Sequence, residues 1–276
     1  MSARDRMPRT RPLTDDVRGL PRQHRTMPEA ATRRRLRAGA ALAVIATGAA
    51  LCAGCGAESG SVALIQKQFT DVIARVSPMV VQIQTAQGLG SGIVYDGDGD
   101  VVTNAHVTSG ATSFVVTLAS GERHAAKLVG ADPANDLAVI HITGATPAPA
   151  SFGDSSKVRA GEISFAIGNP LGLRSSVTQG IVSSVSRSVS EGNRVTLSQA
   201  IQTSAEINPG NSGGALVDLS GRVIGIPTLA GVDPEFGDAQ APGIGFAIPS
   251  STVQRVANQL IAHEIARLRG VGLGIH

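Results

Sequence analysis

Hydrophobic positions recur at helical spacing at both ends of the region from residue 64 to residue 268. Between 64 and 76, six apolar side chains fall on one helical face, and Pro78 ends the segment. From Ser250 to Leu268, another six apolar positions follow the same period behind a serine that can cap the first turn. The pattern therefore predicts one helix at each end of this region.

Between these two helices the pattern changes to short apolar or alternating runs, separated by turns rich in glycine, proline and polar residues. Such runs predict strands at Met79–Thr85, Gly92–Tyr95, Val101–Asn104, Ser113–Leu118, Ala126–Val129, Leu137–Ile142, Ile163–Ile167, Val177–Val185, Arg194–Gln202, Ala215–Leu219 and Val223–Ile226. Closely spaced short strands without helices between them favour antiparallel barrels or sandwiches over a parallel α/β sheet. We expect an all-β body of two barrels, framed by the two helices.

A different pattern precedes this body. Residues 38–54 form an uncharged run of small and apolar residues that follows a cluster of arginines and leads to Cys55. This is the layout of an export signal, in which the basic segment stays inside and the chain behind it leaves the cytoplasm. We expect residues 1–37 to be a basic leader, 38–55 a signal or membrane anchor, and 56–63 a linker.

Both cysteines of the chain, Cys52 and Cys55, lie in the segment 38–55. The string Leu-Cys-Ala-Gly-Cys at 51–55 resembles a bacterial lipobox, although Cys52 stands where Leu or Val is common. Lipidation at Cys55, an uncleaved anchor and plain secretion all remain open, and translation from Met27 would also give a signal of ordinary length. No disulfide can form within the exported body, so its stability must come from its core.

The charge of the chain is divided unevenly. Residues 1–37 hold 11 arginines and 4 acidic residues, which leaves 13 basic and 17 acidic residues, a net charge of −4, for the remainder. A body with this balance does not have the basic surface that nucleic-acid binding requires. We therefore expect no nucleic-acid partner.

Three aspartates alternate with glycines from Asp96 to Asp100, which is how a calcium-binding loop begins. The sixth position of such a loop would be Val101 instead of glycine, and the twelfth would be Val107 instead of glutamate. The coordination shell could not close, and two Asp-Gly pairs between alternating runs are typical of a hairpin. We expect a hairpin and no metal.

A glycine-rich string, Gly-Leu-Gly-Ser-Gly at 88–92, is open to a dinucleotide-binding interpretation. That motif needs a following helix whose N-terminus receives a pyrophosphate, whereas this string leads into a predicted strand. A glycine-rich entry into a strand is the better explanation.

Ser212 lies within Gly-Asn-Ser-Gly-Gly at 210–214, which fits two nucleophile motifs. The nucleophile elbow of α/β-hydrolases requires a strand before the serine, a helix after it, and a catalytic histidine further along the chain. Here turn formers precede Ser212, a strand pattern follows it, and only His263 and His276 come later. The elbow is therefore disfavoured.

The other order, histidine, then aspartate, then serine, is available. His106 ends a predicted inner strand, and Asp136 enters an apolar strand where an unpaired carboxylate would be costly to bury. Pairing with an imidazole would offset that cost and leave the second ring nitrogen to accept the serine proton. His124, His141 and Asp132 are rival candidates that spacing alone does not exclude.

Several strings together resemble the HtrA (DegP-like) family of serine proteases. They are GSGIVYDGDGDVVTNAHV, ADPANDLAVI, FAIGNPLGL, VTQGIVSSVSR, IQTSAEINPGNSGGALVD, GRVIGI and GIGFAIPSSTV, and they span roughly residues 62–262 in the family's order. The resemblance implies a chymotrypsin-like fold of two antiparallel six-stranded barrels, with a protease domain over 64–262. It implies that His106 is the general base, Asp136 its orienting acid and Ser212 the nucleophile, with the backbone N–H groups of Gly210 and Ser212 as the oxyanion hole and no cofactor.

Glu206, Asn208 and Ile226 are the candidate residues of the substrate pocket. Family loops often read Thr-Asp-Ala-Ala before Ile-Asn-Pro-Gly, whereas this chain has Ser204 and Glu206 in place of Asp and Ala. An acid six residues before the nucleophile could favour a basic P1 side chain, while the family generally prefers small or aliphatic ones. A solvent-facing Glu206 without a role in specificity is the simpler interpretation.

Family members usually continue into PDZ domains after a string like that at 272–275, so residues 263–276 are expected to be a tail where such a domain would begin. A natural protease without that module and a truncated product both remain open. The resemblance implies an exported endopeptidase of the cell envelope that cleaves unfolded or damaged proteins, with a homotrimer as an option. The alternative is a dormant or non-catalytic binder of unfolded polypeptides on the same fold.

Overall fold

The computed structural model describes residues 60–144, 148–169, 176–191, 195–208, 210–233 and 239–272, all within the compact unit Ser59–His276. The predicted leader, the signal segment with Cys55, and residues 56–59 of the predicted linker lie outside the described residues, whereas residues 60–63 of that linker are helical. The same holds for residues 273–276 of the predicted tail.

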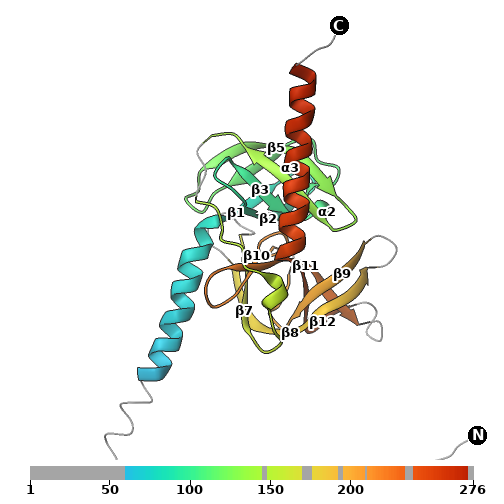
Figure 1. Ribbon diagram of the computed structural model, residues 1–276. Helices are drawn as coiled ribbons and strands as arrows, with labels where there is room; N and C mark the ends of the chain where they lie inside the picture. Colours follow the sequence, from blue (N-terminus) through green and yellow to red (C-terminus); the bar gives the residue numbers. More distant parts are fainter. Residues whose placement is uncertain are drawn as a thin grey trace, which may run out of the picture. The chain divides into compact units, whose positions relative to one another are not determined.

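The first half of the body is a closed antiparallel barrel, which we name barrel 1 (Figure 1). Its strands are β1 (Val80–Gln84), β2 (Leu89–Val94), β3 (Asp100–Thr103), β4 (Phe114–Thr117), β5 (Arg123–Asp132) and β6 (Leu137–Ile142). Around the barrel they follow the order β1-β2-β3-β6-β5-β4. The one-turn helix α2 (Ala105–Thr108) lies in the connection from β3 to β4.

The second half is another closed barrel, named barrel 2 (Figure 1). Its strands are β7 (Ile163–Gly168), β8 (Ser176–Glu191), β9 (Val195–Thr203), β10 (Ala215–Val217), β11 (Val223–Asp233) and β12 (Ala239–Pro249). Their order, β7-β8-β9-β12-β11-β10, repeats that of barrel 1 strand for strand. The expected all-β fold of two six-stranded antiparallel barrels is therefore confirmed.

The core consists of three clusters of buried apolar side chains, one that belongs to each barrel and a larger one shared by both barrels and the terminal helices. Strand β6 shows why: Ile140 packs inside barrel 1, while its neighbours Leu137 and Val139 join the shared cluster. Successive side chains of a strand point to opposite faces, so a strand buried on both faces reads as a continuous apolar run. This shared core fixes the two barrels against each other.

Helices stand at both ends of the body, as the pattern predicts. The first covers residues 60–76, four positions earlier than expected at its start, and the 3₁₀ turn η1 (Ser77–Met79) follows it. Phe69 of this helix contacts Phe165 of barrel 2 edge to face, with ring centroids 5.0 Å apart. Among the described helices, none is long and apolar enough to cross a membrane.

The C-terminal helix α3 (Ser250–Gly272) packs mainly on barrel 1 through β5 and β6 (Figure 1). It runs four residues further than predicted, through most of the expected tail. Tyr95 of barrel 1 donates a 2.7 Å hydrogen bond to the Asn258 side chain, and Leu260 fills the space left by Gly130 on β5. The Ser250 hydroxyl, expected to cap the helix, donates to the Gly153 carbonyl at 2.7 Å.

Two short motifs of the sequence have structural roles. The Asp96–Asp100 segment is the β2–β3 hairpin, in which the Asp96 carboxylate accepts hydrogen bonds from the backbone N–H groups of Asp98 and Asp100. The glycine-rich string opens β2, where Cβ atoms at Gly90 and Gly92 would lie 2.6 Å from valine side chains. The hairpin and the strand entry are both present.

Strand β12 is absent from the predictions, and His106 was expected at the end of a strand. Instead β3 ends at Thr103, and His106 lies on α2. The sequence of β12 contains Pro242, Gly243 and Gly245, which resemble a turn, and only its pairing with β11 and β9 makes it a strand. A short 3₁₀ turn, η2 (Ser155–Lys157), joins the barrels.

Candidate active site

The pairing of β3 with β6 brings His106 to Asp136. Thr103 lies opposite Ala138, so the residues just after β3 meet those just before β6. The His106 Nδ1 lies 2.9 Å from Asp136 Oδ2, and the backbone N–H of His106 donates to Oδ1 at 3.0 Å. Asn104 adds a 3.0 Å hydrogen bond from its amide to the Asp136 carbonyl. The carboxylate is thus held at several points, with its side chain only 5% exposed against 50% for His106.

The tight turn before β6 places this carboxylate. Asp132 closes the turn by accepting hydrogen bonds from the N–H groups of Ala134 and Asn135. Asp136 has φ = 50°, a left-handed conformation that aspartate tolerates better than most residues. Asp132, the rival acid, is therefore engaged in its own turn, and Asp136 is the carboxylate beside His106.

Ser212 approaches the pair from barrel 2, and Thr228 connects them. The Ser212 hydroxyl donates to the Thr228 carbonyl at 3.4 Å, which is a long hydrogen bond. The Thr228 hydroxyl donates a short hydrogen bond to Asp136 Oδ2. Thr228 on β11 therefore contacts both the candidate nucleophile and the candidate acid. Sequence reasoning missed this residue, because a threonine after Pro227 carries no local signal of such a role.

Backbone contacts define the loop around Ser212. The Gly213 N–H donates to the Pro227 carbonyl at 2.9 Å, and the Gly214 N–H donates to the Asn211 carbonyl at 3.0 Å. In a trans peptide the N–H points opposite to the C=O, so the Ser212 N–H is directed away from Gly214. Gly210 has φ = 149°, which favours glycine at this position.

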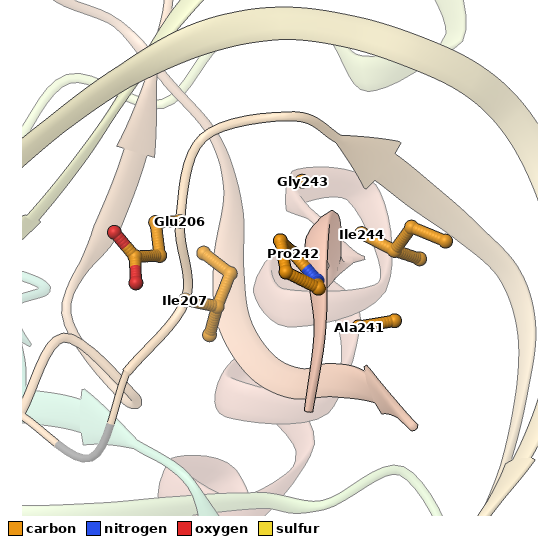
Figure 2. A pocket seen from close by; sticks show the side chains of 6 residues that line it. All are labelled: Glu206, Ile207, Ala241, Pro242, Gly243 and Ile244. Atoms are coloured by element: carbon orange, nitrogen blue, oxygen red, sulfur yellow. The ribbon is translucent and has the colours of Figure 1, made fainter. Parts of the chain in front are cut away.

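A small cavity of about 90 Å³ lies beside this loop (Figure 2). Its lining residues are Glu206, Ile207, Ala241, Pro242, Gly243 and Ile244. We name residues 210–214, around the candidate nucleophile Ser212, the nucleophile loop. Asn211 ties the cavity wall to this loop, since its side-chain amide donates to the Glu206 carbonyl and accepts from the Asn208 N–H. Figure 2 shows the exposed Glu206 carboxylate pointing away from Pro242 and Ile244.

Of the three predicted pocket residues, Glu206 lines this cavity. Asn208 is not among the residues that line it, and its N–H donates to the Asn211 side chain at 3.0 Å. Ile226 is fully buried within the shared core between the barrels. Its side chain has no accessible surface to offer a substrate, so Ile226 is a core residue, and Ile207 and Ile244 supply the apolar lining instead.

The rival histidines have other surroundings. His141 lies 2.9 Å from the buried Asp100, its cross-strand neighbour on β3. Burial raises the pKa of Asp100 above its ordinary value, and the hydrogen bond with His141 opposes this. His124 lies 3.7 Å from Glu122. Within the described part of the chain, no group of three or more histidine, cysteine or acidic side chains could hold a metal ion.

Two closed six-stranded barrels, with a histidine–aspartate pair on one and a serine loop on the other, define the class of trypsin-like peptidases. The chain matches the family model described as trypsin-like peptidase domain over residues 90–226. It is 39% identical over 225 residues to serine protease PepD of Mycobacterium tuberculosis, covering 74% of this chain and 48% of that protein. It is 45% identical over 196 residues to periplasmic serine endoprotease DegP of Escherichia coli K12, covering 70% and 40%.

Solved structures of HtrA-type proteases are also similar to this chain in sequence and fold. The structure titled Deg5 shares 38% identity with a TM-score of 0.62, covering 72% of this chain and 96% of that one. The HtrA-type protease AlgW with tripeptide shares 39% identity with a TM-score of 0.65, covering 71% and 64%. The chain belongs to the HtrA family of trypsin-like serine proteases. It spans less than half the length of the curated relatives PepD and DegP.

Proposed function

We propose that this chain is a serine endopeptidase that uses His106, Asp136 and Ser212. The observation that carries the proposal is the chain of contacts from His106 to Asp136, from Asp136 to Thr228, and from Thr228 to Ser212. These contacts join an imidazole, a carboxylate and a hydroxyl at one junction between the barrels, which supports the proposed roles of base, orienting acid and nucleophile. Membership of a family whose members are named serine proteases supports it.

In the proposed mechanism, Ser212 Oγ attacks a peptide carbonyl while the His106 Nε2 accepts the hydroxyl proton. Asp136 accepts the hydrogen bond from Nδ1–H and stabilises the imidazolium that forms. Collapse of the tetrahedral intermediate breaks the C–N bond, and His106 gives its proton to the leaving amine. Water then attacks the Ser212 ester with His106 again as base, which releases the acid and restores the enzyme.

The negative oxygen of the tetrahedral intermediate needs hydrogen-bond donors. We assign this role to the backbone N–H groups of Gly210 and Ser212. Glycine at 210 leaves its N–H without an obstructing side chain, and its φ of 149° is one that other residues avoid. Loss of one such donor typically lowers kcat roughly 100- to 1,000-fold.

We propose that the substrates are unfolded or damaged polypeptides and that small or aliphatic P1 residues are preferred. The cavity beside the nucleophile loop is small, and apart from Glu206 its lining is apolar or glycine. Because Glu206 is exposed, water screens its charge and weakens any attraction for a basic P1 residue. Hydrolysis of matched peptides with Val or Arg at P1 tests this, and a clear preference for Arg contradicts it.

Export to the outer face of the cytoplasmic membrane or the periplasm, with a lipid on Cys55 or an N-terminal anchor, remains our proposal for localisation. A mass measurement of Cys55-containing peptides from membranes tests the lipid. We also propose a homotrimer through the first helix, where Val62, Leu64 and Ile65 are 65%, 69% and 53% exposed. Light scattering should show the trimer, and a monomer for Leu64→Glu.

The deciding experiment is labelling with a fluorophosphonate, which reacts only with an activated serine. The wild-type protein should become labelled and should cleave casein, whereas Ser212→Ala should do neither. A matched variant, Ser250→Ala, removes a buried serine hydroxyl at the start of α3 and should still label.

The alternative, a dormant binder of unfolded chains, is supported by one observation. The Ser212 hydroxyl has a single proton, and in this structure that proton is donated to the Thr228 carbonyl. Absence of labelling and of casein cleavage under all conditions, together with suppression of aggregation of an unfolded client, would favour this function.

A further inference from the structure

Ser91, the serine of the glycine-rich string on β2, links three segments at the junction between the barrels. It has no accessible surface. Its N–H donates to the Ser212 carbonyl at 3.2 Å, and its carbonyl accepts from the Thr103 hydroxyl at 2.6 Å. Its own hydroxyl contacts Gly210 and Asn169. Every polar group of this one residue is therefore used.

The direction of the Ser91 hydroxyl proton follows from its two partners. The backbone N–H of Asn169 donates to Ser91 Oγ at 2.8 Å, so the oxygen acts as acceptor there. A hydroxyl has one proton, and the other partner, the Gly210 carbonyl at 2.5 Å, can only accept. The proton is thus directed at Gly210, on the loop that carries the nucleophile.

This contact fixes one side of the proposed oxyanion hole. With its carbonyl bound to Ser91, and with the Asn211 N–H at the other end of the same peptide bound to the Asn208 carbonyl at 3.1 Å, the Gly210–Asn211 peptide is held at both ends. The Gly210 N–H is joined to this fixed peptide through the Gly210 Cα alone. The Ser212–Gly213 peptide is also held at both ends, because the Ser91 N–H donates to the Ser212 carbonyl and the Gly213 N–H donates to the Pro227 carbonyl.

Close packing leaves this loop no room to shift. A Cβ atom at Gly213 would lie 2.3 Å from the Ser91 carbonyl oxygen, and one at Gly168 would lie 2.4 Å from the Gly210 carbonyl oxygen. The nucleophile loop is thus in direct contact with β2 of barrel 1 on one side and with the end of β7 on the other. Glycines make this approach possible, and the Ser91 hydroxyl sets its geometry.

We infer that Ser91 is a positioning residue that orients the Gly210 and Ser212 N–H groups for the oxyanion. The inference rests on the proposed peptidase function and adds a residue to it. Ser91 touches neither the substrate nor the reacting atoms, and acts only through the peptides of the nucleophile loop. Its effect should therefore appear in the transition state and not in the binding of the substrate.

The test is the kinetics of Ser91→Ala on a peptide substrate, together with inhibition by a peptide boronic acid, whose adduct with serine is tetrahedral. We expect kcat to fall roughly 10- to 100-fold, since slight misplacement of the donors costs rate. KM should change little, and the inhibition constant of the boronic acid should rise by the factor by which kcat/KM falls. Ser91→Cys, a weak donor of similar shape, should give intermediate values.

Ser250→Ala is the matched control, because it too removes a fully buried serine hydroxyl that donates to a glycine carbonyl. It should leave kcat unchanged, even where it lowers the melting temperature as much as Ser91→Ala does. An unchanged kcat in both Ser91 variants, or a raised KM at constant kcat, overturns the inference while the peptidase function stands. So does failure of both variants to fold while Ser250→Ala folds. A wild-type protein without fluorophosphonate labelling overturns the peptidase function itself, and the inference with it.

Discussion

Barrel 1 and barrel 2 each carry a candidate catalytic group in the same place, the connection between their third and fourth strands. In barrel 1 this connection holds His106, which contacts Asp136 of the same barrel. Asn104, also of barrel 1, donates to the Asp136 carbonyl. In barrel 2 this connection holds Ser212, which Ser91 of barrel 1 contacts through the backbone. Both members of the histidine–aspartate pair thus come from one barrel, although Thr228 of barrel 2 also donates to Asp136. The nucleophile loop, in contrast, is shaped by contacts from both barrels.

This difference shows which contacts the proposed activity depends on most. Disruption within barrel 1 should remove the acid–base pair but leave the nucleophile loop in place. Disruption of the contact between barrels should distort the nucleophile loop while the pair persists. Four substitutions separate these effects.

The largest effect is expected from Asp136→Asn, which breaks the pair in barrel 1. Asparagine tolerates φ = 50°, so the fold should persist, but its amide cannot hold His106 in the required tautomer. We expect kcat/KM to fall by about 10⁴-fold with little change in KM, the loss typical of this substitution in a Ser–His–Asp triad. Peptide hydrolysis and a thermal melt measure this, and a loss below about tenfold argues against the triad.

Gly213→Ala should break the contact between barrels. Its Cβ would lie 2.3 Å from the Ser91 carbonyl oxygen, at φ = 80°. We expect stability to fall by about 2–5 kcal/mol from strain and overpacking, and fluorophosphonate labelling to be lost. Gly121→Ala in barrel 1 is the control, because φ is 89° there but open space surrounds the site. It should cost about 1–2 kcal/mol in denaturant unfolding and leave labelling intact.

Thr228→Val tests the link from barrel 2 to the Asp136 carboxylate. The substitution keeps the shape of the side chain and removes the hydroxyl that donates to Asp136 Oδ2. A hydrogen bond to a charged group contributes about 1.5–3 kcal/mol, so kcat should fall roughly 10- to 100-fold. Thr228→Ser, which retains the hydroxyl, should recover most of the rate. Equal rates for both variants would remove Thr228 from the site.

The smallest effect concerns Asp100, which pairs with His141 on barrel 1 away from the nucleophile loop. Its pKa is raised, mainly by burial, so the folded protein binds this proton more tightly than the unfolded chain. Its contribution to stability is therefore greatest at a pH below the ordinary value of 3.8, and is lost as the pH rises through the folded pKa. Asp100→Asn should flatten the pH dependence of the unfolding free energy above about pH 4, without a change in kcat. An unchanged pH dependence contradicts this.

Much of the fold could be predicted from the sequence, because the pattern of apolar and polar residues along a strand shows whether one or both of its faces are buried. Strand β6 begins and ends at the predicted residues, Leu137 and Ile142. Strand β12 could not be predicted, since its proline and glycines give no strand signal before β9 and β11 pair with it. Ile226 was a candidate pocket residue in the sequence, and only the packing of the two barrels shows that it is buried between them.

The candidate site likewise contains residues that the sequence selects and residues that only the structure reveals. Residue order left rival histidines and a rival aspartate open, and the resemblance of the strings around His106, Asp136 and Ser212 to the HtrA family selected these three as candidates, because such motifs are local. The roles inferred for Ser91 and Thr228 have no local signature, since both act through groups more than 90 positions away in the sequence. The sequence alone thus determined the class of the fold and the choice of candidate catalytic side chains. Only the tertiary structure decided how they are held, because a hydrogen bond between barrels depends on a docking geometry that no single segment specifies.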